Sequence, residues 1–178
     1  KINLDYDFVV KNTYIERGCS AYLLVNGPKW EDAEANANRL GGHLVSINDS
    51  EESEWIANEF SKVKKYSYEG DTNAGDPSEW INLWIGGQFV NNKWEWTSGD
   101  EWVEVGGDLN NDNAWGFGEK PNYGYNQNVM SKALAHFNHR KDENQFTRHG
   151  EGSGTWYWAQ TNGISNNTRG IVEIPICN

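Results

Sequence analysis

The 178-residue sequence lacks the features that mark binding to membranes or to nucleic acids. No apolar run approaches the roughly 18 residues that cross a bilayer, so we expect no membrane insertion. Basic residues are scarce: 15 lysines and arginines stand against 26 acidic residues, which leaves a formal net charge of −11. This charge disfavours binding to the phosphates of nucleic acids and anionic lipids, and it makes cations the favoured partners.

Aromatic side chains are abundant instead, with 10 Trp, 8 Tyr and 6 Phe. A disordered acidic chain would not carry so much surface suited to burial. The length allows one domain with a real core and is short for two. We therefore expect a single folded domain over residues 1–178 that is soluble as given.

Only two cysteines are present, Cys19 and Cys177, one near each end of the chain. Two unpaired thiols in a reducing cytosol are one interpretation. A disulfide is the other, and it fits the strands expected around the two residues. Extending the pairing of the cysteines inward opposes Tyr22 with Ile174 in antiparallel strands. Because this register joins both ends of the chain, we predict the disulfide.

Apolar spacing predicts two helices. Trp30, Ala33, Ala37 and Leu40 recur at helical spacing, and two glycines follow them as a stop signal. A second helix is predicted at about 50–64, with a cap at Asp49 or Ser50 and acidic residues in its first turn. Strands are predicted at 20–25, 80–89, 93–97, 155–160 and 169–176, with Trp84, Trp94 and Trp96 in the core.

Between about residue 98 and residue 154 little periodic pattern survives, apart from the short apolar run VMSKALAHF (129–137). More than fifty mostly irregular residues are unusual inside a compact domain unless the segment is functional or held by ligands. We therefore interpret residues 98–154 as a long binding loop.

Several motifs occur in the order found in one protein family. They are WEDAEANANRLGGHLVSI (30–47), WIGG (84–87), KWEWTSGDEW (93–102), GEKPN (118–122) and TWYWAQTNG followed by GIVEI (155–174). Together they cover roughly residues 18–177, and they resemble the C-type lectin-like domain. The resemblance implies an α+β fold, in which two helices flank antiparallel β-sheets and the long loop region forms a binding surface.

The sequence departs from the usual family pattern at one disulfide. The family commonly has a cysteine in the first helix, at the position of Ala37, bonded to a cysteine in the last strand, at the position of Val172. Both are absent here, and a disulfide between Cys19 and Cys177 looks like a replacement that joins the same two ends of the domain. Bacterial members of the family often lack the usual pair, so we expect a bacterial-type member.

In sugar-binding members, a Glu-Pro-Asn tripeptide, a later acidic or amide residue, and an Asn-Asp pair hold one Ca²⁺, whose coordination two sugar hydroxyls complete. Glu119 and Asn122 match the tripeptide, although Lys120 is inserted within it. Gln127 and Asn128 fall where the next ligand is expected, and Tyr157 and Trp158 replace the Asn-Asp pair. The resemblance thus implies a sugar site at Glu119, Asn122, Gln127, Asn128, Tyr157 and Trp158, with its last two positions aromatic.

A second group of oxygen ligands lies just upstream. Asp108, Asn110, Asp112 and Glu119 stand at relative positions 1, 3, 5 and 12, the oxygen spacing of an EF-hand loop, although no flanking helices can be recognised. The family places an auxiliary Ca²⁺ in this region. We predict a calcium site there, with Asn122 as a shared ligand; local turns in a solvated loop are the alternative.

Two further features have both a functional and a simpler interpretation. Glu51 or Glu52, together with Glu173, resembles a structural calcium position of the family, although surface helix capping by the first two is the favoured explanation. The sequons Asn48-Asp49-Ser50 and Asn166-Asn167-Thr168 would matter only in a eukaryotic secretory pathway, and chance occurrence in an asparagine-rich chain is the simpler reading.

No catalytic triad spacing, phosphate loop or catalytic cysteine is present, so we expect no enzyme. The resemblance implies an extracellular or cell-surface recognition module that binds a carbohydrate in a Ca²⁺-dependent way through the long loop. One alternative is a module for protein binding or host-surface adhesion that does not hold sugar through the ion. Another is a structural domain of a larger extracellular protein.

Overall fold

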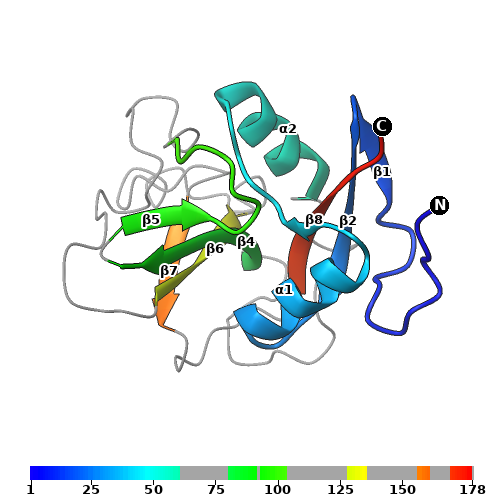
Figure 1. Ribbon diagram of the computed structural model, residues 1–178, viewed down its shortest axis with the longest axis horizontal. Coiled ribbons are helices and arrows are strands. Elements are labelled where there is room, and N and C mark those ends of the chain that lie inside the picture. Colours follow the sequence, from blue (N-terminus) through cyan, green and yellow to red (C-terminus); the bar gives the residue numbers. More distant parts are fainter. Residues whose placement is uncertain (61–79, 92, 104–127, 136–155, 161–168, 178) are drawn as a thin grey trace, which may run out of the picture.

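A computed structural model describes residues 1–60, 80–91, 93–103, 128–135, 156–160 and 169–177 of the chain. These residues form two helices and eight strands (Figure 1). The elements are β1 (Ile15–Arg17), β2 (Ser20–Asn26), α1 (Trp30–Arg39), β3 (His43–Leu44), α2 (Ser50–Phe60), β4 (Trp80–Val90), β5 (Lys93–Trp96), β6 (Asn128–Ala135), β7 (Trp156–Gln160) and β8 (Arg169–Pro175).

Both ends of the chain meet in one pair of strands. β2 and β8 run antiparallel over seven residue pairs, from Ser20 opposite Pro175 to Asn26 opposite Arg169. The disulfide Cys19–Cys177 closes this pair just beyond the ladder, with its Cα atoms 5.0 Å apart. The predicted disulfide and the antiparallel pairing are therefore confirmed, and Figure 1 shows the two termini on the same side of the molecule.

The predicted register of this pair is wrong by one residue. Tyr22 lies opposite Glu173, whereas the spacing of the cysteines predicts Ile174. The cysteines lie outside the strands, so their bond does not have to follow the ladder; there the Ile176 N–H donates to the Cys19 carbonyl at 2.9 Å. A shift of one residue exchanges the faces of a strand, so the observed register determines which side chains of β2 and β8 meet.

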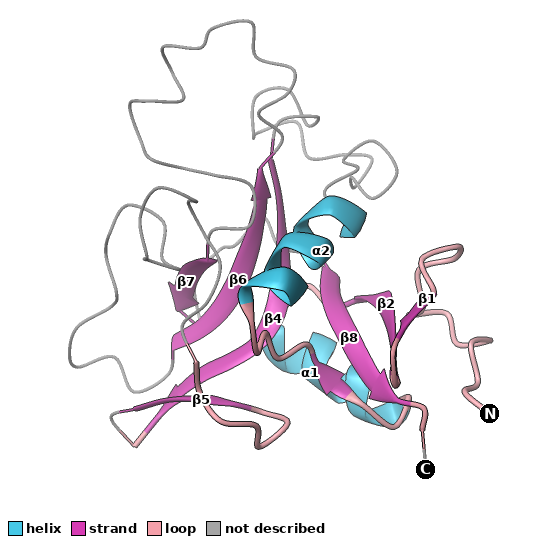
Figure 2. Cartoon of the chain, turned by 90° about the horizontal axis from the view of Figure 1, so that it is seen from above, coloured by secondary structure: helices cyan, strands magenta, loops and turns pink. Residues whose placement is uncertain are grey.

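The two helices cover opposite faces of the β2–β8 pair. Alternate residues of these strands belong to two separate core clusters, because successive side chains of a strand point to opposite faces. Ile56 and Phe60 of α2 belong to the cluster that holds Tyr22, and Ala33 and Ala37 of α1 belong to the other. Figure 2 shows both helices against the sheet.

Position 172 explains how the chain does without the usual family disulfide. Ala37 and Val172 are both completely buried and belong to the same core cluster. Packing of two apolar side chains thus occupies the place where the resemblance implies a bond between cysteines. The helix ends at a left-handed residue, since Gly41 has a φ of +86°.

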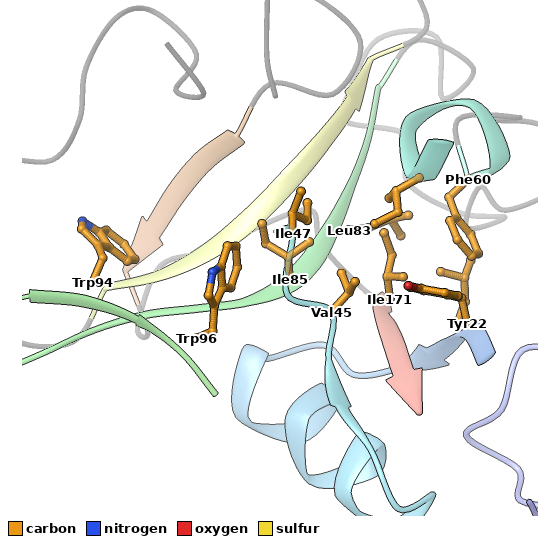
Figure 3. Packing of buried hydrophobic residues seen from close by; sticks show 11 residues of the cluster. Tyr22, Val45, Ile47, Phe60, Leu83, Ile85, Trp94, Trp96 and Ile171 are labelled. Atoms are coloured by element: carbon orange, nitrogen blue, oxygen red, sulfur yellow. The ribbon is translucent and has the colours of Figure 1, made fainter. Parts of the chain in front are cut away.

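The sheet is mixed, with the strand order β1-β2-β8-β4-β6-β7. In addition, β3 pairs with β8, and β5 pairs with β4. Most neighbours are antiparallel, but β4 and β8 meet in parallel where Trp84 lies opposite Gly170. The predicted tryptophans Trp84, Trp94 and Trp96 are buried, as expected. Figure 3 places Trp94 and Trp96 at one end of the larger cluster and Tyr22 and Phe60 at the other.

Part of the expected loop is a strand. Residues 128–135, inside the segment 98–154 that we interpreted as irregular, form β6 and pair with β4 on one side and β7 on the other. The run VMSKALAHF signalled this strand, but its apolar residues do not alternate regularly and so gave no clear period. Among the described residues, no helix is long and apolar enough to cross a membrane.

Candidate functional site

The predicted loop ligands divide into two groups. Asp108, Asn110, Asp112, Glu119, Asn122 and Gln127 lie outside the described residues. The other three predicted residues lie on two neighbouring strands. Asn128 begins β6, and Tyr157 and Trp158 are consecutive residues of β7.

The ladder between β6 and β7 brings these three positions together. Asn128 lies opposite Gln160, and Met130, two residues further along, lies opposite Trp158. Ser131 lies opposite Tyr157 in the same ladder. Asn128 is therefore a strand residue and not a loop residue as expected, because its backbone pairs with β7. Positions that are about thirty residues apart in the sequence thus share one edge of the sheet, where β7 is the last strand.

A second candidate site lies at the other end of the molecule, around the hydroxyl of Tyr22. This hydroxyl is 2.8 Å from Oε1 of Glu52 on α2 and 3.2 Å from Oε1 of Glu173 on β8. The Ser20 hydroxyl donates to the same Glu173 oxygen at 2.8 Å. Two carboxylates and two hydroxyls from β2, α2 and β8 therefore converge on one point, which we call the Glu52–Glu173 site.

Glu52, and not Glu51, is the helix residue at this site. The Glu52 side chain reaches back so that Oε2 accepts a hydrogen bond from the Asn48 N–H at 3.0 Å, while the Glu52 N–H donates to Asp49 Oδ1 at 2.7 Å. This reciprocal pair resembles a capping box, in which the side chain at the third helical position faces the cap. Asp49 thus caps α2, as predicted, and the residue Glu52 is 5% exposed.

Glu51 points to solvent instead. Its side chain is 89% exposed and forms an ion pair of 3.4 Å with Arg17, whose guanidinium also stacks over Trp55. The sequence alone does not distinguish Glu51 from Glu52, since both stand in the first turn of the helix. The structure separates their roles: Glu51 forms an ion pair with Arg17 on the surface, and Glu52 faces Glu173.

Burial and repulsion both act on the Glu173 carboxyl. Its pKa is raised, first by loss of solvation and then by the negative charges of Glu52 and Asp100, while hydrogen bonds from Ser20 and Tyr22 act in the opposite direction. The pKa of the Tyr22 hydroxyl is raised as well, chiefly by burial and by the charge of Glu173. The site therefore disfavours additional negative charge and favours a proton or a cation.

The described residues supply no side-chain cation to this site. Ion pairs in this part of the chain join Arg17 to Glu51, His43 to Glu34 and Lys93 to Glu95, and none of them includes Glu52 or Glu173. Among the residues described, no group of three or more His, Cys, Asp or Glu side chains is arranged so that it could hold a metal ion. The two carboxylates and two hydroxyls offer the hard oxygen ligands that Ca²⁺ prefers. Because Ca²⁺ takes six to eight oxygen ligands, water molecules would have to complete its coordination here.

Sequence reasoning missed Ser20 and Tyr22 as members of this site. The predicted register placed Ile174 opposite Tyr22, and this pairing hid the contact with Glu173. The available signal is an acidic residue inside an otherwise apolar strand, since Glu173 stands between the buried residues Val172 and Ile174 of β8. A charged residue at such a position requires polar partners on the facing strand.

No family model matches this sequence. A perlucin-like protein from Mytilus galloprovincialis is 26% identical over 115 residues, which are 60% of this chain and 65% of the relative. The match thus spans about two-thirds of that protein's length. These comparisons include animal proteins and give no support to a bacterial-type member.

Solved structures resemble the chain over nearly its whole length. The cow C-type carbohydrate-recognition domain of CD23, determined in the presence of the oligosaccharide GlcNAc2Man3, has a TM-score of 0.57 at 18% identity and covers 95% of this chain and 98% of its own. SPL-2 from Saxidomus purpuratus, described as a Ca²⁺-independent C-type lectin, has a TM-score of 0.54 at 20% identity, with 94% of each chain covered. This chain therefore has the C-type lectin-like fold.

Proposed function

We propose that this domain recognises a carbohydrate through the edge of the sheet formed by β6 and β7 and the loop residues next to it in sequence. The observation that carries the proposal is the β6–β7 ladder, which places Asn128 two register positions from Trp158. Both positions belong to the sugar site that the resemblance implies, although the sequence separates them. The solved relative of similar fold that was determined with an oligosaccharide supports this assignment.

Aromatic residues give this edge a second way of holding a sugar. Tyr157 and Trp158 stand where sugar-binding members have an Asn-Asp pair, so these positions supply no carboxylate to an ion. Aromatic rings offer apolar faces on which the C–H surfaces of a sugar can stack. Sugar binding at this edge therefore combines stacking with the remaining oxygen ligands Glu119, Asn122, Gln127 and Asn128.

Calcium is the cofactor that we propose for the loop, with Asp108, Asn110, Asp112, Glu119 and Asn122 as its ligands. Carboxylate and amide oxygens are the ligands that Ca²⁺ prefers, and the net charge of −11 favours cations. The Glu52–Glu173 site is a second cation position in this proposal. There the ion would be a structural one, since it would tie α2 to the pair of terminal strands.

The domain acts by binding and not by catalysis, and it works outside the cell or at the cell surface. The disulfide between Cys19 and Cys177 supports an oxidising location, because such bonds persist in secreted and surface proteins. Glycans on a partner surface are the ligands in this proposal. Binding of a protein surface without sugar is the alternative, and it predicts that the domain binds no glycan.

A glycan array probed with the purified protein in Ca²⁺ and in excess chelator tests the proposal. We expect sugar binding in Ca²⁺, with a loss of at least tenfold in affinity for the variant Glu119→Ala. The exposed residue Glu51 provides the control, because Glu51→Ala removes a carboxylate far from the sheet edge. Binding of sugar that is equal in both conditions would remove calcium from the proposal, and failure to bind any glycan would overturn it.

A further inference from the structure

The sequon Asn48-Asp49-Ser50 occupies a surface turn directly before α2. The three residues before it, Val45, Ser46 and Ile47, are buried, whereas Asn48, Asp49 and Ser50 are all exposed. The chain thus leaves the core at Asn48 and enters the helix at Ser50. An acceptor asparagine must lie on the surface of the folded protein, and this one meets that condition.

The hydrogen bonds of the turn leave the Asn48 side chain available. The backbone N–H of Asn48 donates to Glu52 Oε2, the Asp49 carboxylate accepts from the Glu52 N–H, and the Asp49 carbonyl accepts from the Ser53 N–H at 3.1 Å. Within the described residues, no hydrogen bond uses the side-chain amide of Asn48 or the hydroxyl of Ser50. The turn is therefore held by its backbone and by Asp49 and Glu52, so a group attached to Asn48 would not disturb it.

We propose that Asn48 is an N-glycosylation site of this domain. In this reaction the amide nitrogen of Asn48 attacks the anomeric carbon of an oligosaccharide linked to a lipid pyrophosphate. The new C–N bond replaces the C–O bond to the pyrophosphate, the amide loses one proton, and the lipid pyrophosphate leaves. The enzyme and the lipid-linked donor come from the secretory pathway, and the chain supplies only the acceptor with the Ser50 hydroxyl two residues later.

The disulfide is consistent with folding in the secretory pathway, the compartment that N-glycosylation requires. Cys19 and Cys177 are exposed and bonded, which is typical of proteins that fold in the oxidising lumen where lipid-linked oligosaccharides are transferred. A chain that passes through this lumen presents its sequons before it folds. The proposal is independent of what the domain binds, so the carbohydrate-binding function can fail while the modification stands.

The glycan would also limit which faces of the domain are free. Asn48 immediately precedes the cap of α2, on the side of the chain where Glu52 faces Glu173. A hydrated oligosaccharide at this position would shield the start of α2 from protein partners. The β6–β7 edge, at the far end of the strand order from β2, would stay open.

Secretion of the full chain from a eukaryotic cell tests the proposal. All proteins compared carry Thr168→Ala, which removes the second sequon and leaves Asn48-Asp49-Ser50 as the one acceptor motif. The secreted protein is treated with a peptide N-glycosidase in heavy-oxygen water and mapped by mass spectrometry. We expect the peptide with residue 48 to carry the labelled aspartate that marks a former glycan, in most copies of the protein.

Matched variants show whether the motif is responsible. Ser50→Ala and Asn48→Gln should abolish the label, whereas Ser50→Thr, which keeps the motif, should retain it. All three change exposed side chains outside the hydrogen bonds of the turn, so equal secretion and equal melting temperatures verify that folding is unchanged. Secreted, folded protein in which residue 48 is unmodified asparagine would overturn the proposal, as would a label that persists in Ser50→Ala.

Discussion

The hydroxyl of Tyr22 lies within hydrogen-bond distance of the carboxylate of Glu173, which stands directly opposite it in the β2–β8 ladder. The same hydroxyl is closer still to Glu52, at 2.8 Å. A phenol carries only one proton and can donate it to one of the two carboxylates. If Glu52 and Glu173 are both charged, the hydroxyl can donate to only one of them. The contact with the other carboxylate then has no hydrogen, and the two negative carboxylates face each other in a partly buried site.

We expect Glu173→Gln to stabilise the protein at neutral pH when divalent cations are absent. Burial raises the pKa of Glu173 in the folded state above its value in the unfolded chain. The folded state therefore holds the proton more tightly, so the stability contributed by this group is present below the unfolded pKa of about 4.3 and is lost as pH rises through the folded pKa. Glutamine cannot ionise and avoids that loss.

Urea unfolding of both proteins in chelator between pH 3.5 and pH 8 measures this effect. The difference in free energy of unfolding should favour the variant near pH 8 and shrink towards zero at the acid end. Comparing the two proteins at each pH cancels the contributions of the other titrating groups. A difference that is the same at every pH would show that the Glu173 carboxyl titrates normally and would contradict the prediction.

Tyr22→Phe removes the hydroxyl that both carboxylates share. We expect a loss of about 1–3 kcal/mol in the free energy of unfolding, because Oε1 of the buried Glu52 loses its donor, whereas Glu173 keeps the hydrogen bond from Ser20. Tyr14→Phe is the matched control: its hydroxyl also donates to a glutamate, Glu16, at 2.6 Å, but Tyr14 is 37% exposed. The control should change the free energy by less than about 0.5 kcal/mol. Equal losses for the two variants would mean that burial of the Tyr22 bond has no energetic consequence.

Replacing both Cys19 and Cys177 by serine opens a loop whose ends are 158 residues apart in the sequence. The chain-entropy account gives a stabilisation of about 5 kcal/mol for such a loop, and measured losses for native disulfides are typically about 2–5 kcal/mol. We expect a loss in that range, measured by urea unfolding at neutral pH. The wild type in a reducing agent should approach the double variant, whereas equal stability of oxidised wild type and variant would show that packing of β2 on β8 holds the ends without the bond.

The sequence predicts the secondary structure well where one face of an element is buried. Trp30, Ala33 and Ala37 repeat at the helical period because they all pack on the same cluster, and the predicted helix matches α1. β6 was not predicted as a strand because its apolar run has no regular alternation. β1 and β3, with three and two residues, are too short to show a period at all.

The Glu52–Glu173 site shows why a site is harder to predict than a fold. Glu173 was identified as a candidate from the resemblance, but its partners depend on a register that differs by one residue from the spacing of the cysteines. Sequence alone does not fix that register, since the disulfide lies beyond the last paired residues. The choice between Glu51 and Glu52 likewise depends on the direction in which each side chain leaves the first turn of α2.

Calcium titrations of Glu52→Gln and Glu51→Gln test whether the Glu52–Glu173 site holds a cation. Both variants remove one charge from the first turn of α2, and they differ in that Glu52 is buried beside Tyr22 while the Glu51 side chain is 89% exposed. If an ion binds between Glu52 and Glu173, the wild type and Glu51→Gln should gain the same increase in melting temperature on addition of Ca²⁺. Glu52→Gln should lose the part of that increase that comes from this site, because mass action stabilises only a folded state that binds the ion. Glu119→Ala, which changes the proposed loop site, provides a comparison: if the two sites bind ions independently, its loss should add to that of Glu52→Gln in the double variant. An increase that is unchanged in Glu52→Gln would show that the carboxylate pair binds no calcium and that a proton alone relieves the repulsion between them.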